Sequence, residues 1–225
     1  MKRAAKTSRY NNDLEASYHP QTDGIGVDLG VKSLAIVSDG RIFENINRTS
    51  RARRLERRLR REQRRLSRKY EMRKKKGGST ATASANIAKK KLSVQRLHQR
   101  LANLRRNHEN QVIHALVEQK PRFITVEDLN VTGMMKNRHL SKAVVQQRFY
   151  SFREKLRRKA EIIGIEVRIA DRFYPSSKTC HACGHVHSGL KLKDRTYVCP
   201  ACGYKKDRDF NAALNLRDTK NYRIA

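Results

Sequence analysis

The sequence predicts an α/β fold with two additions, a long helical hairpin and a small metal-binding ribbon. Three observations indicate this fold class: short apolar segments of strand length beside acidic residues, a long basic stretch with helical periodicity, and two Cys-x-x-Cys pairs. At 225 residues the chain can hold one sizeable domain with insertions. The expected order is an N-terminal tail (1–23), three strands (24–47), a basic helical hairpin insertion (48–120), a strand–helix–strand segment (121–173), a zinc ribbon (174–206), and a last helix with its tail (207–225).

The charge of the chain indicates a polyanionic partner. It has 52 Lys and Arg against 21 Asp and Glu, a formal net charge of +31. Such an excess repels itself unless phosphates neutralise it, and each neutralised phosphate releases a counterion. A membrane surface fits less well, because the sequence has no apolar run of spanning length and no aromatic-rich amphipathic helix. The N-terminus also lacks the apolar segment of a secretory signal. We expect nucleic acid as the partner, no membrane, and a cytoplasmic, nucleoid-associated location.

The segment GIGVDLGVKSLAIVSDG (24–40) predicts the first two strands. Apolar residues alternate from Ile25 to Leu29, which is the period of a half-buried strand, and Asp28 then lies on the opposite face near the strand end. LAIVS is the second strand, an Asp-Gly turn follows, and RIFENI is the third strand. An acid in such a place is usually solvated or caps a backbone group. However, three antiparallel strands with an acid on the first recur in phosphoryl-transfer nucleases.

The middle of the chain predicts two basic helices. Residues 48–76 contain sixteen Lys or Arg and three Glu. Apolar residues at heptad-like spacing form a thin seam along each helix. The seam residues are Ala52, Leu55, Leu59 and Leu66 in the first helix, and Val94, Leu97, Leu101 and Leu104 in the second. Between the two helices, Lys74–Asn86 has the composition of a flexible polar linker.

The arginines of the first helix are candidate contacts to nucleic acid. They are Arg53, Arg54, Arg57, Arg58, Arg60, Arg61, Arg64 and Arg65. The alternative is a solvated arm whose charge only aids solubility, but sixteen cations against three anions favour phosphate contact. Such contacts carry no base information, so we expect them to be independent of sequence.

Two further acids follow the hairpin. The segment PRFITVEDLNV (121–131) predicts a buried strand that ends in Glu127 and Asp128. Asp209 lies in the first turn of the helix predicted for NAALNL, where a carboxylate meets the positive end of the helix dipole. If Asp28, Glu127 and Asp209 converge, they can hold two divalent metals about 4 Å apart for phosphodiester cleavage. Magnesium prefers such oxygen ligands.

Between these acids the sequence predicts one basic helix over 141–163 and a strand at EVRIA (166–170). The helix is expected to turn Val145 and Phe149, among others, toward the core. For Arg172 the sequence leaves two roles open, contact with a phosphate or an ion pair with an acid.

The four cysteines predict a structural zinc site. Cys180-His-Ala-Cys183 and Cys199-Pro-Ala-Cys202 are fifteen residues apart, and a Gly follows each pair. Each Cys-x-x-Cys turn aims two thiolates at one point, and the glycine allows the tight turn beneath the metal. Four sulfur ligands close the site, so we expect a structural Zn²⁺. Three nearby histidines are interpreted as exposed loop residues, not as ligands: His181, His185 and His187.

Four stretches, in this order, resemble TnpB, the transposon-encoded family related to type V CRISPR effectors. They are GIGVDLGVKSLAIVSDG, FITVEDLNVTGMMKNRHLSKAV, DRFYPSSKTCHACG and YVCPACGYKKDRDFNAALNL, and the resemblance covers roughly residues 24–217. It implies an RNase H-like (RuvC) domain with a helical hairpin insertion and an inserted zinc ribbon. By motif position it implies Asp28, Glu127 and Asp209 as catalytic acids that bind Mg²⁺. The zinc ribbon would then fix where the chain re-enters the core, and so help to place Asp209.

The resemblance also implies RNA-guided cleavage of DNA, with a guide RNA as a second partner. Family members carry a long N-terminal region that binds guide RNA and target duplex, whereas 23 residues precede the first matching motif here. We therefore expect that region to be missing or supplied by a partner. The alternative is a non-cleaving nucleic-acid-binding protein, a truncated transposon protein or regulator that keeps this fold. A ribosomal or polymerase-associated zinc ribbon protein also fits the charge, but leaves DLG, VEDLN and DRDFNAALNL unexplained.

Overall fold

The protein is described from a computed structural model, which covers residues 20–75, 81–191 and 193–225. Most of the predicted N-terminal tail therefore lies outside the described residues. The chain divides into two compact units. One contains the described residues up to Glu44 together with Gln111–Ala225, and the other is Asn45–Asn110. Each unit is described by itself.

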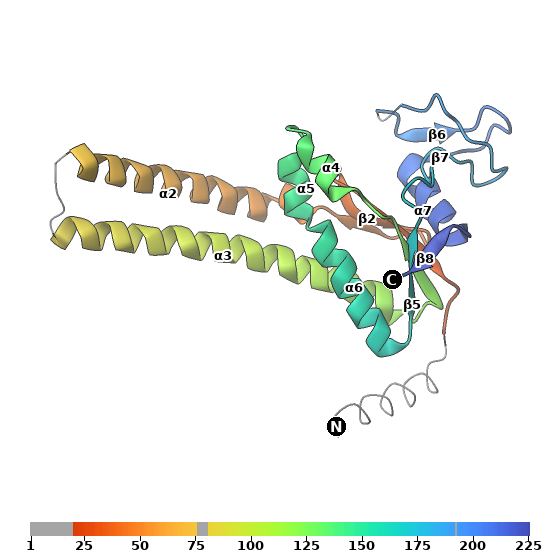
Figure 1. Ribbon diagram of the computed structural model, residues 1–225, viewed down its shortest axis with the longest axis horizontal. Helices are drawn as coiled ribbons and strands as arrows, with labels where there is room; N and C mark the ends of the chain where they lie inside the picture. Colours follow the sequence, from red (N-terminus) through yellow and green to blue (C-terminus); the bar gives the residue numbers. More distant parts are fainter. Residues whose placement is uncertain (1–19, 76–80, 192) are drawn as a thin grey trace, which may run out of the picture. The chain divides into compact units, whose positions relative to one another are not determined.

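The first unit is built on a six-stranded mixed sheet with the order β3-β2-β1-β4-β5-β8 (Figure 1). The strands are β1 (Ile25–Leu29), β2 (Ser33–Val37), β3 (Ile42–Glu44), β4 (Phe123–Val126), β5 (Glu166–Ala170) and β8 (Tyr222–Ile224). The first three strands form an antiparallel meander, β4 and β5 run parallel to β1, and β8 is antiparallel to β5. The α/β class and the five strands expected from the sequence are confirmed; β8 was not expected.

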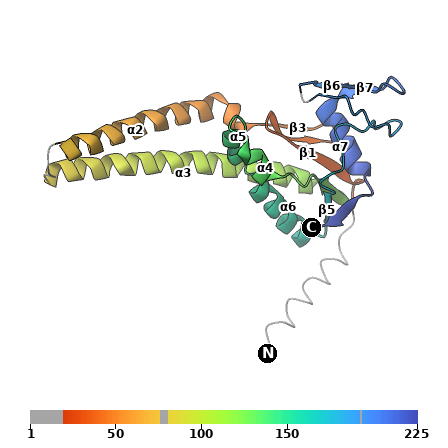
Figure 2. The ribbon, with the colours of Figure 1, turned by 45° about the horizontal axis from the view of Figure 1, so that its top comes forward.

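Alternation along β1 assigns its side chains to the two faces of the sheet. Ile25, Val27 and Leu29 are buried in the main core, together with apolar residues of α6 (Phe149–Ile163) and of the end of α3 (Ala81–Glu118). The other two residues of β1, Gly26 and Asp28, are on the opposite face of the sheet, where α7 (Arg208–Asp218) packs on the strand. Figure 2 shows α7 beside the sheet. Helix and strand approach closely, because a Cβ on Gly26 would lie 2.0 Å from the backbone oxygen of Ala213.

The prediction of a single helix over residues 141–163 was wrong. The structure has two helices, α5 (Ser141–Gln147) and α6, joined at Arg148 in a left-handed conformation with φ 58°. The break turns Gln147 inward, where its side-chain amide donates to the backbone oxygen of Gly30 at 2.8 Å. It also shifts the buried face, so Val144 is buried and Val145, expected in the core, is exposed. A short helix, α4 (Val131–Lys136), precedes α5.

The ribbon segment contains a two-stranded sheet of β6 (Thr196–Val198) and β7 (Lys205–Asp207). Its small core consists of Cys180, Cys199 and the fully buried Tyr197. The Tyr197 hydroxyl donates to the backbone oxygens of Lys178 at 3.2 Å and His185 at 3.4 Å. This cluster is separate from the main core, so the ribbon has few apolar contacts of its own to stabilise it.

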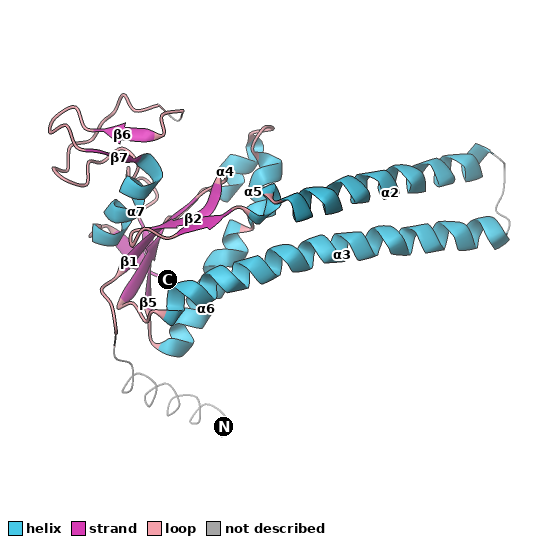
Figure 3. Cartoon of the chain, turned by 180° about the vertical axis from the view of Figure 1, so that it is seen from behind, coloured by secondary structure: helices cyan, strands magenta, loops and turns pink. Residues whose placement is uncertain are grey.

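The second unit contains a short 3-10 helix (Ile46–Arg48), α2 (Ser50–Lys75) and most of α3. Figure 3 shows α2 and α3 side by side as an antiparallel pair. The predicted seam is observed, since Leu59, Val94, Leu97 and Leu101 form a buried cluster, with Leu55 and Leu66 packed against it. The linker expected at Lys74–Asn86 was too long: α2 extends to Lys75 and α3 begins at Ala81, and residues 76–80 lie outside the described residues. Over the described ranges, no helix combines the length and apolarity that a bilayer span requires.

Candidate metal centre and acidic site

The four cysteines lie at one point, as the sequence predicted. Among the described residues they are the only group of three or more His, Cys, Asp or Glu side chains whose ligand atoms all lie within 4.8 Å of one another. The Sγ atoms of Cys180 and Cys202 are 3.7 Å apart, and those of Cys183 and Cys199 are 3.6 Å apart. Four thiolates about 2.3 Å from a tetrahedral Zn²⁺ have sulfur–sulfur distances of about 3.8 Å. The donor set and its spacing therefore fit zinc.

Each cysteine pair closes a turn of the same kind. The backbone N–H of Gly184 donates to the oxygen of Cys180 at 2.9 Å, and that of Gly203 to the oxygen of Cys199 at 3.0 Å. Both glycines have positive φ, 76° and 72°, which explains why Gly follows each pair. Burial opposes ionisation of Cys199, but donation from the backbone N–H groups of Cys202 and Ala201 outweighs it and lowers the pKa of that thiol to about 6.

The histidines of the ribbon have other contacts. His181 Nδ1 lies 3.6 Å from the Asp218 carboxylate. His187 packs edge-on against Tyr197, with 6.3 Å between the ring centroids. The group of side chains that could hold the metal consists of the four cysteines and includes none of these histidines.

Strand register brings Asp28 and Glu127 together. β1 and β4 run parallel, with Val27 opposite Val126, so the next residue of each strand, Asp28 and Glu127, reaches the same edge of the sheet. The two carboxyl groups are close enough to share a hydrogen bond when one of them carries a proton. Ser176, at the start of the ribbon segment, donates from Oγ to Oε1 of Glu127 at 3.0 Å.

Asp209 reaches the same region from α7. Ala213 lies against Gly26, and Asp209 is one helical turn before Ala213, about 6 Å back along the helix axis. Asp28 lies two residues beyond Gly26, about 6.6 Å along the strand. Asp209 therefore comes level with Asp28. Its charge contributes to the raised pKa of both Asp28 and Glu127, but its oxygens do not complete a tight ligand group with theirs.

Two arginines hold Asp209 in its present position. Arg208 donates to Oδ1 from Nε at 3.1 Å and from Nη2 at 2.8 Å, and Arg195 of the ribbon lies 3.8 Å from Oδ2. The neighbouring Asp207 has a different task, because its side chain accepts from the backbone N–H groups of Asp209 and Phe210 and caps α7. Asp207 is thus part of the helix start and not of the acidic group.

Burial and mutual repulsion raise the pKa of Asp28 well above its usual value, and the Arg208 charge offsets this only in part. Burial also raises the pKa of Glu127, against the lowering effect of the hydrogen bonds with Asp28 and Ser176. Asp28 and Glu127 are therefore costly to ionise together. A bound cation would remove that cost, and hard oxygen donors of this kind fit Mg²⁺.

The sequence did not identify the side chains that connect the ribbon to this site. Asn215 is buried in α7, and its amide donates to the backbone oxygens of Ser176 and Thr179, both at 2.7 Å. Asn211, also buried, donates to the oxygen of Thr179 at 2.8 Å and accepts from the backbone N–H of His181 at 3.2 Å. A signal was present, since two Asn four residues apart in an apolar helix interior need buried partners. These bonds fix Ser176, and through it Glu127.

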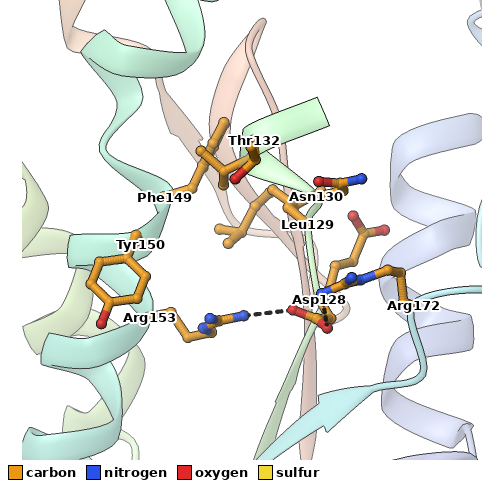
Figure 4. Close-up of a pocket in the computed structure, with 11 residues that line it drawn as sticks. Asp128, Leu129, Asn130, Thr132, Phe149, Tyr150, Arg153 and Arg172 are labelled. Atoms are coloured by element: carbon orange, nitrogen blue, oxygen red, sulfur yellow. Dashed lines mark hydrogen bonds and ion pairs between the residues drawn. The ribbon is translucent and has the colours of Figure 1, made fainter. Parts of the chain in front are cut away.

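Figure 4 shows Asp128 between Arg153 of α6 and Arg172. Arg153 donates to one carboxylate oxygen at 2.7 Å and Arg172 to the other at 2.9 Å. Burial opposes ionisation of Asp128, but these hydrogen bonds and the positive charges prevail and lower its pKa. Of the two roles left open for Arg172, the ion pair is the one observed.

The eight predicted arginines of α2 are all exposed. Two of the three acids of α2 pair with the partner helix instead: Glu56 pairs with Arg105 at 3.0 Å, and Glu62 pairs with Lys90 at 2.6 Å, whereas Glu71 is exposed. Arg65 also contacts Glu62, at 3.0 Å. A hollow of about 620 Å³ between the helices is lined by Arg51, Arg54, Leu55, Arg58, Arg100, Asn103, Leu104 and Asn107. Glu56 and Glu62 are thus paired across the hairpin, whereas the predicted arginines of α2 are on its exposed surface.

Comparison with family models identifies the chain. A model described as a probable transposase, OrfB of IS605, matches residues 8–138, and a model of the Cas12f1-like TNB domain matches residues 149–216. Together these matches define a protein of the transposase class. The chain belongs to the TnpB family of the IS605 type, which confirms the family that the sequence motifs indicated.

Curated relatives match over most of this chain. A Streptomyces pristinaespiralis protein named "Putative RNA-guided DNA endonuclease" is 34% identical over 87% of this chain and 44% of its own length. InsQ of Escherichia coli, named in the same way, is 30% identical over 91% of this chain and 51% of its own length. The CRISPR-associated endodeoxyribonuclease Cas12f1 of Sulfoacidibacillus thermotolerans is 26% identical over 94% of this chain and 50% of its own length. The chain spans about half the length of these relatives.

Solved structures agree on the fold. The Cas12f1 chain in a complex with sgRNA and target DNA matches 90% of this chain and 51% of its own length, with a TM-score of 0.53 and 18% identity. A Cas12f ternary complex matches 89% of this chain and 39% of its own, with a TM-score of 0.60 and 19% identity. At these identities the likeness concerns the fold.

Proposed function

We propose that this chain is the nuclease part of a TnpB-type, RNA-guided DNA endonuclease. In this proposal the sheet with α6 and α7 is an RNase H-like (RuvC) domain, the α2–α3 hairpin is an insertion, and the zinc ribbon is inserted before α7. The observation that carries the proposal is the meeting of Asp28, Glu127 and Asp209 at one sheet edge, where burial and repulsion raise the pKa of the first two. DNA and a guide RNA are the proposed partners, in the cytoplasm and at the nucleoid.

Asp28 and Glu127 would hold Mg²⁺ together with Asp209. Bound there, the metal supplies Lewis-acid activation of water and charge stabilisation on the leaving oxygen. The chain's own residues supply the positioning. Ser176 fixes one oxygen of Glu127 and leaves the other for the metal. Arg208 is the counterion that Asp209 exchanges for a metal.

The structural zinc would act indirectly. It joins two turns of the ribbon, and Asn211 and Asn215 join the ribbon to α7. The ribbon therefore connects the position of Glu127, through Ser176, with that of α7, which carries Asp209. Zinc takes no part in the chemistry in this proposal, since four cysteines leave no open position.

The test is cleavage of single- and double-stranded DNA with Mg²⁺, with and without RNA from the native locus. Glu127→Gln should lose cleavage and keep DNA binding. Glu118→Gln is the matched control, because Glu118 is an exposed acid at the end of α3. Binding of Mn²⁺, measured by calorimetry on the same variants, gives a second readout. Cleavage by Glu127→Gln at the wild-type rate would refute the assignment of the acids.

A second candidate function is a non-cleaving nucleic-acid-binding protein that keeps this fold. The observation in its favour is that Arg208 donates two hydrogen bonds to one oxygen of Asp209, Oδ1, while the oxygens of Asp209 form no tight ligand group with Asp28 and Glu127. In this case wild type binds DNA and no condition with Mg²⁺ and RNA gives cleavage. The absence of any Mn²⁺ binding at the acids would support the same reading.

A further inference from the structure

A hollow of about 400 Å³ lies at the carboxyl end of β4, on the side of the sheet that α6 covers (Figure 4). Its walls are of two kinds. Leu29, Leu129 and Phe149 contribute apolar surface, whereas Arg153, Arg172, Glu127 and Asp128 contribute charged groups. A hollow of this size, in which apolar surface adjoins a few convergent polar groups, has the character of a small-ligand site.

Arginines outnumber carboxylates where this hollow adjoins a second one. Arg153 and Arg172 line the first hollow with Glu127 and Asp128, and Arg172 and Asp128 also line the second, together with Arg223. All three arginines approach the carboxylate of Asp128: Arg153 at 2.7 Å, Arg172 at 2.9 Å and Arg223 at 3.7 Å. Arg172 and Arg223 keep 52% and 63% of their side-chain surface exposed. Guanidinium groups held in place by a carboxylate, with other edges turned to solvent, are prearranged for a phosphate.

The hollow also offers an aromatic surface. Tyr150, on the first turn of α6, lines it and is 65% exposed. The Arg153 guanidinium lies 6.0 Å from the centre of its ring, which holds the ring beside the cationic group. Exposed aromatic rings next to positive charge are the usual platform for a base of single-stranded nucleic acid.

We propose that this hollow binds one nucleotide of the DNA strand beside the acidic site, with its base against Tyr150 and its phosphate at the rim, on Arg172 and on Arg223 of the adjoining hollow. Asp128 is a positioning residue that orients the arginines. Glu127 also lines the hollow and is the chain neighbour of Asp128, so a nucleotide here lies next to the bond that the acids would cut. The inference rests on the proposed function for its choice of DNA as ligand.

The test is made without divalent metal, so that it is independent of cleavage. A short single-stranded DNA carrying 5-iododeoxyuridine is bound to the full chain in EDTA and crosslinked by light, and the crosslinked peptide is mapped. Binding affinity is measured by fluorescence anisotropy across a range of salt concentrations. Arg172→Gln is compared with Arg157→Gln, a change of equal charge on α6 at an arginine paired with Glu161. Asp128 keeps Arg153 in the first variant, so the fold should persist, and thermal unfolding checks this.

We expect a crosslink at Tyr150 in wild type and in Arg157→Gln, and its loss in Arg172→Gln. The slope of log affinity against log salt should fall in magnitude by about 0.7 in Arg172→Gln alone, which corresponds to one phosphate contact on a single strand. Equal slopes and equal crosslinking in both variants would overturn the proposal. A crosslink at Tyr150 in a protein that never cleaves DNA would support the nucleotide site while refuting the nuclease. Cleavage by wild type without any crosslink at Tyr150 would refute the site alone.

Discussion

At the scale of single residues, Asp28 and Glu127 determine how the protein responds to pH. Burial, together with the charge of neighbouring acids, holds the pKa of both carboxyl groups above the values they have in an unfolded chain: Glu127 and Asp209 act on Asp28, and Asp209 acts on Glu127. The native state therefore binds protons that the unfolded state releases. By linkage, the stability that these two groups contribute is greatest below the unfolded pKa of about 4, and it is lost as pH rises through the raised native pKa values. This is the reverse of the usual effect of a salt-bridged carboxylate.

Asp28→Asn should therefore stabilise the metal-free protein at neutral pH. The amide keeps a hydrogen bond to Glu127 and removes one charge from the buried group. We expect a higher melting temperature than wild type at pH 7 in EDTA, with the difference shrinking as pH falls toward about 4. Thermal unfolding followed by circular dichroism across this range measures it, with Asp39→Asn as a control at a partly exposed acid paired with Arg41. If Asp28→Asn raises the melting temperature by the same amount at pH 7 and near pH 4, the native pKa of Asp28 is not raised in the way described here.

At the scale of elements, the packing of α7 on β1 sets the position of Asp209. The two elements approach so closely that only a glycine fits at position 26, since an added Cβ would lie 2.0 Å from the Ala213 oxygen and 2.4 Å from the Arg217 nitrogen. Both are backbone atoms, so no side-chain rotation can relieve the clash. The helix as a whole has to move.

Gly26→Ala should destabilise the protein by about 1–3 kcal/mol, the usual cost of overpacking a close contact. Gly189→Ala is the control, because a Cβ there meets only the His187 ring at an ordinary 3.4 Å. Urea unfolding gives the free-energy difference. Because α7 carries Asp209, the same variant should also bind Mn²⁺ more weakly than its loss of stability explains. Unfolding curves that coincide with wild type would show that α7 is not held against β1 in this way.

The ribbon is the element that depends most on a metal. Its core is one buried tyrosine with the cysteines around it, which is too little apolar surface to order a loop of this length unaided. Removing zinc with a chelator should expose Tyr197 and its neighbours to hydrogen exchange while β4 stays protected. Hydrogen-exchange mass spectrometry resolves the two peptides. Protection of the Tyr197 peptide that survives chelation would mean that zinc does not hold the ribbon together.

How far the sequence predicted these elements follows from the range of the interactions that form them. The cysteine turns and the strand of Asp28 depend on local periodicity and spacing, and both were predicted. The break at Arg148 was not, because it depends on Gln147 reaching the Gly30 oxygen, 117 residues away in the chain. The same holds for the bonds of Asn215 to Ser176 and of Arg172 to Asp128, which join distant segments. Sequence patterns made Asp28, Glu127 and Asp209 candidates, but they did not indicate the side chains that contact these acids.

At the scale of the whole molecule, charge is unevenly placed, and this bears on how nucleic acid is bound. The two central acids of α2, Glu56 and Glu62, are paired with α3, whereas the predicted arginines of α2 point outward. The hairpin and the hollow at Asp128 thus differ in kind. The first is a long cationic surface suited to many phosphates, and the second is a small pocket suited to one nucleotide.

Replacing Arg57, Arg61 and Arg64 together by Gln tests the long surface. These three lie on one face of α2, at spacings of four and three residues, and outside the Leu59–Leu97 seam, so the hairpin should still form. If each contacts one phosphate of a duplex, the magnitude of the salt slope of DNA affinity should fall by about 2.7. The matched control removes the same charge from exposed positions of the other unit, with Lys136, Arg138 and Lys205 changed to Gln. A hairpin whose charge serves only solubility would give the same small change in both triple variants. A large fall confined to the α2 variant would instead assign the duplex to the hairpin and leave the hollow at Asp128 for the strand that is cut.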